Sequence, residues 1–190
     1  MSKTAVTSAP ILPVLAERWS PRSYTDQALT RTDLASAFEA ARWSPSANNS
    51  QEWRYIVGFR GDATFETIAG TLAGWNATWA PTAGALVVAA AQVEDAEGKA
   101  NPYAIYDLGQ SVAHFSVQAH ADGLHVHQMA GTDTAALDEA FNLPTGVKSF
   151  VVFAVGHLGA ADALPEQLAE REAKPRERRA LGETVFYGAL

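Results

Sequence analysis

The chain has 190 residues, of which 47% are hydrophobic and 18% charged, enough for one globular domain with a sizeable core. Its formal charge of −7 argues against a nucleic-acid or anionic-membrane binder, because phosphate-rich surfaces require a basic face. The absence of cysteine excludes disulfides, thiolate nucleophiles and cysteine-ligated zinc. The longest apolar run, Ala83–Ala91, is about half of the ~20 residues that a membrane span needs, and the first residues do not resemble a signal peptide. We therefore expect a single cytoplasmic domain over residues 1–190, with no nucleic-acid or membrane partner.

Helical periodicity marks four segments. We expect the first helix to be capped by Thr30 or Thr32, the third to stop at Gly123, and the fourth to end before Pro144. The four predicted helices are Asp33–Trp43, Thr64–Leu72, Tyr106–Ala121 and Asp133–Phe141.

Three short, mainly apolar segments lie between or after these helices and are predicted to be strands. The first alternates, with one face made by its odd-numbered residues, whereas the other two are continuously apolar, which indicates cover on both faces. Because helices alternate with strands that no short hairpin joins, the pattern predicts either an α+β or an α/β arrangement, with a central sheet between helices. The predicted strands are Trp53–Phe59, Ala83–Gln92 and Ser149–Gly156, and the alternating face consists of Trp53, Tyr55, Val57 and Phe59.

Several common chemistries lack their motifs. Neither the dinucleotide fingerprint G-x-G-x-x-G nor the P-loop occurs. The segment Gly109–Ala113 resembles a hydrolase elbow around Ser111, but it lies inside a predicted helix, where a nucleophilic serine could not project from a tight turn. Among the five histidines, His125 and His127 would share a face of an extended segment, yet no recognised metal-ligand spacing accompanies them. We interpret the histidines and the five tryptophans as core or interface residues and predict no metal site.

Three separated polar clusters interrupt the apolar pattern. They are Arg18–Tyr24, Ser44–Trp53 and Lys174–Arg179. Taken singly, they could be a helix lead-in, a turn and a solvated charge run. Taken together, they offer cations for a phosphate and a hydrogen-bonding loop for a planar heterocycle. The apolar residues Val185–Tyr187 follow the last cluster and look like a strand, so this tail is either a solvated end or an arm lying on another subunit.

The first two clusters resemble the FMN-dependent nitroreductase family. Arg18, Ser20, Arg22 and Tyr24 follow the order R-x-S-x-R-x-Y, and after a helix residues 45–53 follow P-S-A-x-N-S-Q-x-W. Similar segments are Gly74–Asn76, Met129–Asp133 and Lys174–Arg176, so that the resemblance extends from about residue 15 to residue 188. The chain departs from the family pattern at Trp19, where a small polar or basic residue is common, at Glu52, where proline is common, and in the short 93–103 connection.

The resemblance implies a central mixed sheet flanked by helices, in a homodimer whose C-terminal arm is exchanged onto the partner. It implies FMN as the cofactor, held at its phosphate and ribityl end by Arg18, Ser20, Lys174 and Arg176, with Trp19 in the same segment. It further implies that Arg22 lies at the flavin pyrimidine edge, where a cation favours the reduced ring, and that Asn76 bonds the pyrimidine rim. The loop Pro45, Ser46, Ala47 and Asn49 would reach the flavin of the partner, and backbone groups of Met129, Ala130 and Gly131 would face flavin N5.

The activity implied by the resemblance is a ping-pong transfer of hydride from NADH or NADPH, through flavin N5, to an electron-poor acceptor such as a nitroaromatic, a quinone or an enal-like compound. No catalytic side chain is assigned. Two alternatives stay open: a flavoprotein of the same fold with another flavin reaction, either substrate oxidation or flavin cleavage, and a flavin-binding module without turnover.

Overall fold

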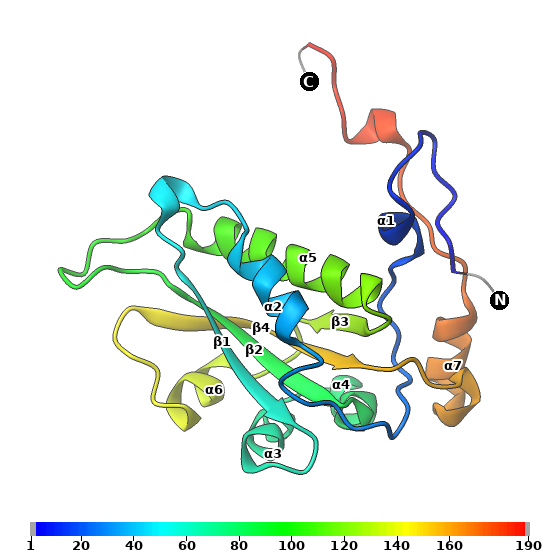
Figure 1. Cartoon of the computed structure of the whole chain (residues 1–190), viewed down its shortest axis with the longest axis horizontal. Coiled ribbons are helices and arrows are strands. Elements are labelled where there is room, and N and C mark those ends of the chain that lie inside the picture. Colours follow the sequence, from blue (N-terminus) through cyan, green and yellow to red (C-terminus); the bar gives the residue numbers. More distant parts are fainter. Residues whose placement is uncertain (1–2, 189–190) are drawn as a thin grey trace.

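The computed structural model describes residues 3–188 and contains a four-stranded sheet with the strand order β1-β2-β4-β3 (Figure 1). Every adjacent pair in this sheet is antiparallel, so the expected mixed sheet is wrong for the described residues. The reason is the position of β4, which lies between β2 and β3; these two strands run in the same direction but do not pair. The strands are β1 (Trp53–Phe59), β2 (Ala85–Gln92), β3 (His125–Met129) and β4 (Val147–Gly156).

Helices cover both faces of the sheet (Figure 1). One face carries α2 (Ala35–Arg42) and the long α5 (Ala104–Ala121), whereas the other carries α3 (Ala63–Gly70), α4 (Asn76–Trp79) and α6 (Thr134–Ala140). This arrangement explains the unbroken apolar sequence of β2, because each of its side chains meets a helical layer. The α+β architecture with a helix-covered sheet is therefore confirmed.

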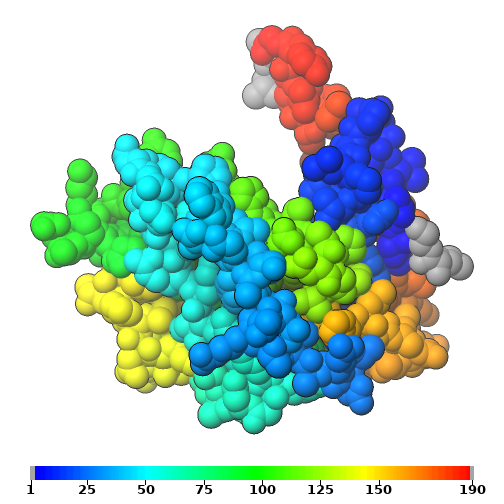
Figure 2. All heavy atoms as spheres, in the orientation of Figure 1, coloured from blue at the N-terminus to red at the C-terminus, as the bar shows by residue number. Residues whose placement is uncertain are grey.

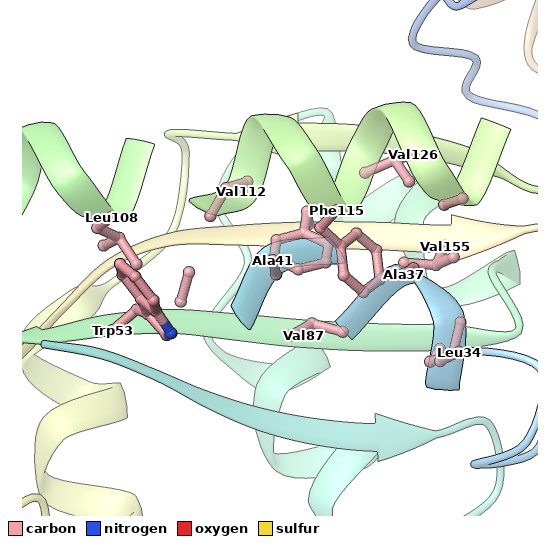
Figure 3. Packing of buried hydrophobic residues seen from close by; sticks show 14 of the residues in the cluster. Leu34, Ala37, Ala41, Trp53, Val87, Leu108, Val112, Phe115, Val126 and Val155 are labelled. Carbon is pink, nitrogen blue, oxygen red and sulfur yellow. The ribbon is translucent and has the colours of Figure 1, made fainter. Parts of the chain in front are cut away.

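The core on the α2–α5 face is packed around Phe115, whose ring centroid lies 4.9 Å from that of Phe153 on β4 (Figure 3). The four residues of the alternating β1 face all pack in this cluster, as their spacing predicted. Val87 of β2 also belongs to it, whereas the next residue, Val88, points into the cluster on the opposite face. Both faces of β2 are thus closed to water at these two residues.

The predicted helices are found with shifted boundaries. The helix before Gly123 begins at Ala104 and ends as expected, since Gly123 adopts a φ of +82° that favours glycine. The capping prediction for the first helix is wrong, because that helix begins only at Ala35 and has no side-chain cap. Thr30 instead donates from its N–H and its hydroxyl to the Asp33 carboxylate, closing a turn ahead of the helix.

Four elements have no counterpart among the sequence predictions: α1 (Pro13–Glu17), α4, β3 and α7 (Glu166–Ala173). Because α1 and α4 are about one turn long and α7 is mostly polar, none of the three helices shows the apolar periodicity that reveals longer helices. Conversely, residues 185–187 form no strand and follow a 3₁₀ turn at Leu181–Glu183. The remaining 3₁₀ turns are Ala47–Asn49, Ala80–Thr82 and Ala161–Ala163. None of the helices within residues 3–188 combines the length and apolar character that a bilayer crossing requires.

Candidate functional site

A cavity of about 240 Å³ lies where the chain before α2 meets the chain after α7. These two segments run side by side although more than 150 residues separate them in sequence (Figure 1). We call this space the cationic cavity, because seven lysine and arginine side chains line it. Its lining residues are Lys3, Arg18, Trp19, Ser20, Arg22, Arg171, Glu172, Lys174, Pro175, Arg176 and Arg178.

The cationic cavity contains a single carboxylate, that of Glu172, whose side chain is 3% exposed. Arg22 donates two hydrogen bonds to this carboxylate: its backbone N–H donates to Oε1 over 2.8 Å and its Nη1 donates to Oε2 over 3.4 Å. None of the other six cations forms an ion pair with a carboxylate of residues 3–188. The cavity therefore presents a surplus of positive charge in a chain whose overall charge is negative.

The crowding of these cations has an electrostatic cost. Burial lowers the pKa of the Arg18 guanidinium, and the neighbouring charges of Arg176 and Arg178 lower it further. A guanidinium is nevertheless charged at neutral pH, so these cations repel one another. An anion placed among these groups would relieve this repulsion, which is the behaviour expected of a phosphate-binding site.

Histidines of the β3 edge hold the Arg18–Arg22 segment in place. His127 Nδ1 lies 2.8 Å from the carbonyl oxygen of Pro21, and its ring packs 4.5 Å from that of Trp79. His125 packs edge-on against His120, at 5.1 Å between ring centroids. Burial lowers the pKa of both His125 and His127 to about 4, so these rings are neutral at pH 7. Within residues 3–188, no three His, Asp or Glu side chains are grouped to hold a metal ion.

A second predicted region, around Asn76, is also assembled within the chain. Asn76 Nδ2 donates to the carbonyl oxygen of Gly131 over 3.1 Å, and the same oxygen accepts from Ala73 N–H over 3.0 Å. A side chain at Gly131 would place Cβ 2.8 Å from Asn76 Nδ2, so any other residue there would force the Asn76 side chain to shift. Met129 is buried and Ala130 is exposed.

The loop at residues 45–49 lies elsewhere. Ala47 N–H donates to Asp107 Oδ2 over 2.8 Å, next to the start of α5, whereas Arg18 acts electrostatically on His120 near the end of that helix. Thirteen residues of helix correspond to about 20 Å. One protomer therefore does not bring the loop to the cationic cavity.

Two buried carboxylates hold this loop. Asp107 accepts from Ala47 N–H, and Glu52 accepts from Asn101 Nδ2 over 2.9 Å and from the Ser50 hydroxyl over 2.8 Å. Burial raises the pKa of Glu52, but the hydrogen bonds that it accepts offset this, and the pKa lies below its usual value. The loop backbone is constrained as well, since Asn48 and Asn49 adopt φ values of +53° and +56°. Glu52, noted in the sequence as a departure, is thus a structural anchor of the loop.

Sequence reasoning missed three lining residues of the cationic cavity: Lys3, Arg171 and Glu172. Their positions depend on α7 and on the return of the N-terminal segment, neither of which has a sequence signature. The elbow-like Ser111 is confirmed as structural, because it is fully buried in α5 and bonded to the Tyr55 hydroxyl at 2.7 Å and to the Ala41 carbonyl oxygen at 2.9 Å.

Comparison with known proteins agrees with this architecture. A family model described as the nitroreductase family matches residues 15–69 and 59–157, most of the chain. The chain therefore belongs to the nitroreductase family, whose motif order its residues carry.

Individual relatives extend the match. An uncharacterized 15.4 kDa protein of Mycolicibacterium smegmatis is 41% identical over 143 residues, covering 71% of this chain and 95% of that protein. The crystal structure of an oxidoreductase containing FMN superposes with a TM-score of 0.93 at 30% identity, covering 100% of this chain and 97% of that one. A nitroreductase family protein from Streptococcus pneumoniae has the same fold, with a TM-score of 0.75 at 15% identity over 92% of this chain and 98% of that one.

Proposed function

We propose that this protein is an FMN-dependent oxidoreductase that carries hydride from NADH or NADPH to an electron-poor acceptor by a ping-pong mechanism. The acceptor class is a nitroaromatic, a quinone or an enal-like compound. The observation that carries the proposal is the cationic cavity: Arg18, Ser20, Lys174 and Arg176, which match the family motif from opposite ends of the chain, line one cavity with surplus positive charge.

The residues of the cationic cavity fit a phosphate monoester. The cations Arg18, Lys174 and Arg176 have no carboxylate partner within residues 3–188, and the Ser20 hydroxyl lies beside them as a neutral donor. Charge-assisted bonds of this kind contribute about 1.5–3 kcal/mol each. Bound FMN supplies an electron carrier that accepts hydride at N5 and returns it to a second substrate.

The other matched residues have separate tasks in this proposal. Asn76 would bond the pyrimidine rim, and the backbone of Ala130 and Gly131 would face N5. Arg22 would provide positive charge near the pyrimidine edge, although Glu172 offsets part of that charge. No side chain is assigned as an acid, so solvent would supply the proton that accompanies hydride transfer to the acceptor.

We infer that the working form is a homodimer in which the loop of Pro45, Ser46, Ala47 and Asn49 reaches the FMN of the partner. Two observations support this: the loop lies about 20 Å from the cationic cavity along α5, and large apolar side chains are exposed just after α2, at the start of α5 and on the tail. Such patches are typical of association surfaces. Their exposed residues are Trp43, Tyr103, Ile105, Tyr106, Leu181, Val185, Phe186 and Tyr187.

The C-terminal arm is proposed to lie on the partner subunit. After Arg178 the chain leaves the body and projects outward (Figure 2), with Tyr187 96% exposed. A strand at residues 185–187 would then require the partner's sheet, since the protomer gives it no pairing. Each protomer would remain one FMN-binding domain over residues 1–190.

The proposal is tested with purified protein and FMN. We expect a yellow complex whose visible absorbance is bleached by NADH or NADPH without oxygen and restored by a nitroaromatic or a quinone. A yellow complex that neither nucleotide bleaches would favour a flavin-binding module or another flavin reaction. A colourless protein that takes up no FMN would refute the proposal.

A further inference from the structure

We propose that residues 3–17 form a strap over the cationic cavity and that Lys3 is an additional ligand of the phosphate group bound there. The inference rests on the proposed FMN site, because it assigns one more residue to it. Most of the strap lies outside the family match, which begins at residue 15.

The position of the Lys3 ammonium is fixed by backbone oxygens. Its Nζ donates to the carbonyl oxygens of Glu172 and Lys174 and lies 5.3 Å from the centroid of the Trp19 ring. Two of its three N–H groups are thereby used, and the third is available to a ligand in the cavity that Lys3 lines. Carbonyl groups orient the ammonium without cancelling its charge, because they are dipoles and not anions.

The strap is tied to the cavity from the opposite side by Arg176. The Nη1 of this guanidinium donates to the carbonyl oxygen of Lys3 over 2.8 Å and to that of Ala16 over 2.5 Å. The strap also closes on itself, with Ala5 N–H donating to the Ala16 carbonyl oxygen over 2.8 Å. Nε and Nη2 of Arg176 remain for an anion, so one side chain contacts both strap and ligand.

Because Arg176 contacts both the strap and the ligand, closure of the strap and binding of the ligand are coupled. An anion that orders Arg176 also orders the carbonyl acceptors of the strap, and a closed strap presents Lys3 to the anion. By thermodynamic linkage, the ligand must then stabilise the closed strap by the same factor by which closure raises its affinity. The strap is therefore expected to tighten when a phosphate-bearing ligand binds.

The experiment compares the affinity for FMN with that for riboflavin, which lacks only the phosphate, in the wild type and in three variants. Lys3→Gln removes the charge, Lys3→Arg keeps it, and Lys99→Gln removes an exposed lysine outside the cationic cavity as the matched control. We expect Lys3→Gln to lower the affinity for FMN about 10-fold and the affinity for riboflavin less than about 2-fold. Lys3→Arg should recover most of the loss, and Lys99→Gln should change neither affinity.

Amide hydrogen exchange of wild-type protein provides a second readout that does not depend on the variants folding. The amide of Ala5 should exchange more slowly with FMN bound than without it, and riboflavin should have a smaller effect. Equal losses for FMN and riboflavin in Lys3→Gln, or unchanged exchange at Ala5, would overturn the inference. Failure of the wild type to bind either flavin would instead contradict the proposed function.

Discussion

The two ends of α5 carry opposite kinds of charge cluster. At its end lies the cationic cavity, where six of seven cations have no carboxylate partner within residues 3–188. At its start, the buried carboxylates of Asp107 and Glu52 are each satisfied by donors of the chain itself. Charge that is satisfied internally stabilises a loop, whereas charge left unsatisfied is available to a ligand. Whether a charged group has a partner within the chain therefore distinguishes structural residues from ligand-binding residues better than the residue type does.

The largest expected effect of a substitution on stability is the loss on removing a carboxylate that is hydrogen-bonded within the chain. Asp107→Ala leaves the half-buried N–H of Ala47 without its acceptor, and we expect the free energy of unfolding to fall by about 2 kcal/mol. Urea unfolding of the variant and of Asp122→Ala, an exposed control just after the same helix, measures the difference. Equal stability of the two variants would remove the distinction between the clusters.

Removing an unsatisfied charge should act on binding instead. We expect Arg18→Ala to lower the affinity for FMN about 30-fold, which is equivalent to about 2 kcal/mol. The free energy of unfolding should stay unchanged or rise, because the substitution relieves the repulsion from Arg176 and Arg178. Titration of FMN against flavin absorbance, paired with urea unfolding, tests both halves. A destabilised Arg18→Ala protein would mean that this cation is structural.

Acid should destabilise the cationic end through its histidines. The folded pKa of His125 and His127 is about 4, below the unfolded value near 6.5. Their stabilising contribution is therefore complete above pH 6.5 and is lost as the pH falls from there towards 4. At pH 5 we expect a loss of about 1–2 kcal/mol for each ring. Unfolding of the wild type and of His125→Gln at pH 7 and pH 5 measures it; an equal pH dependence would disprove the role of His125.

The smallest effect concerns the one carboxylate of the cationic cavity. Glu172→Gln keeps an acceptor for Arg22 but removes the negative charge, so we expect the reduction potential of bound FMN to rise by a few tens of millivolts, where about 30 mV corresponds to 1.4 kcal/mol. Arg22→Ala should lower the potential. Spectroelectrochemistry of the flavin complex measures the reduction potential of each variant. A potential that neither substitution moves would place this ion pair away from the flavin ring.

Sequence patterns predicted those parts of the fold that local chemistry controls. Alternation placed the four β1 residues on one face, and the unbroken apolar run of β2 indicated two covered faces. The pairing order was beyond reach, because β4 lies between β2 and β3 and pairs with residues far from it in the sequence. The predicted capping by Thr30 or Thr32 is wrong because Thr30 donates its N–H and its hydroxyl to the Asp33 carboxylate, in a turn that precedes the helix.

The candidate site divides in the same way. The motif residues Arg18, Ser20, Lys174 and Arg176 were named from their order in the chain, and the fold brings all four to one cavity. Glu172 and Lys3 could not be named, because a lone carboxylate and a lone lysine carry no pattern. Their importance arises from neighbours about 150 to 170 residues away in sequence.

By itself, the sequence determined four of the seven α-helices within residues 3–188, three of the four strands and the family motif, since each depends on side chains that are near one another in the chain. Tertiary structure alone decided which charges are neutralised and which remain open to an anion. Electrostatic energy depends on distance in space and on burial, and neither is written in the order of residues. An arginine side chain can therefore anchor the strap, form an ion pair with a carboxylate or remain available to a phosphate, depending on which groups the fold places beside it.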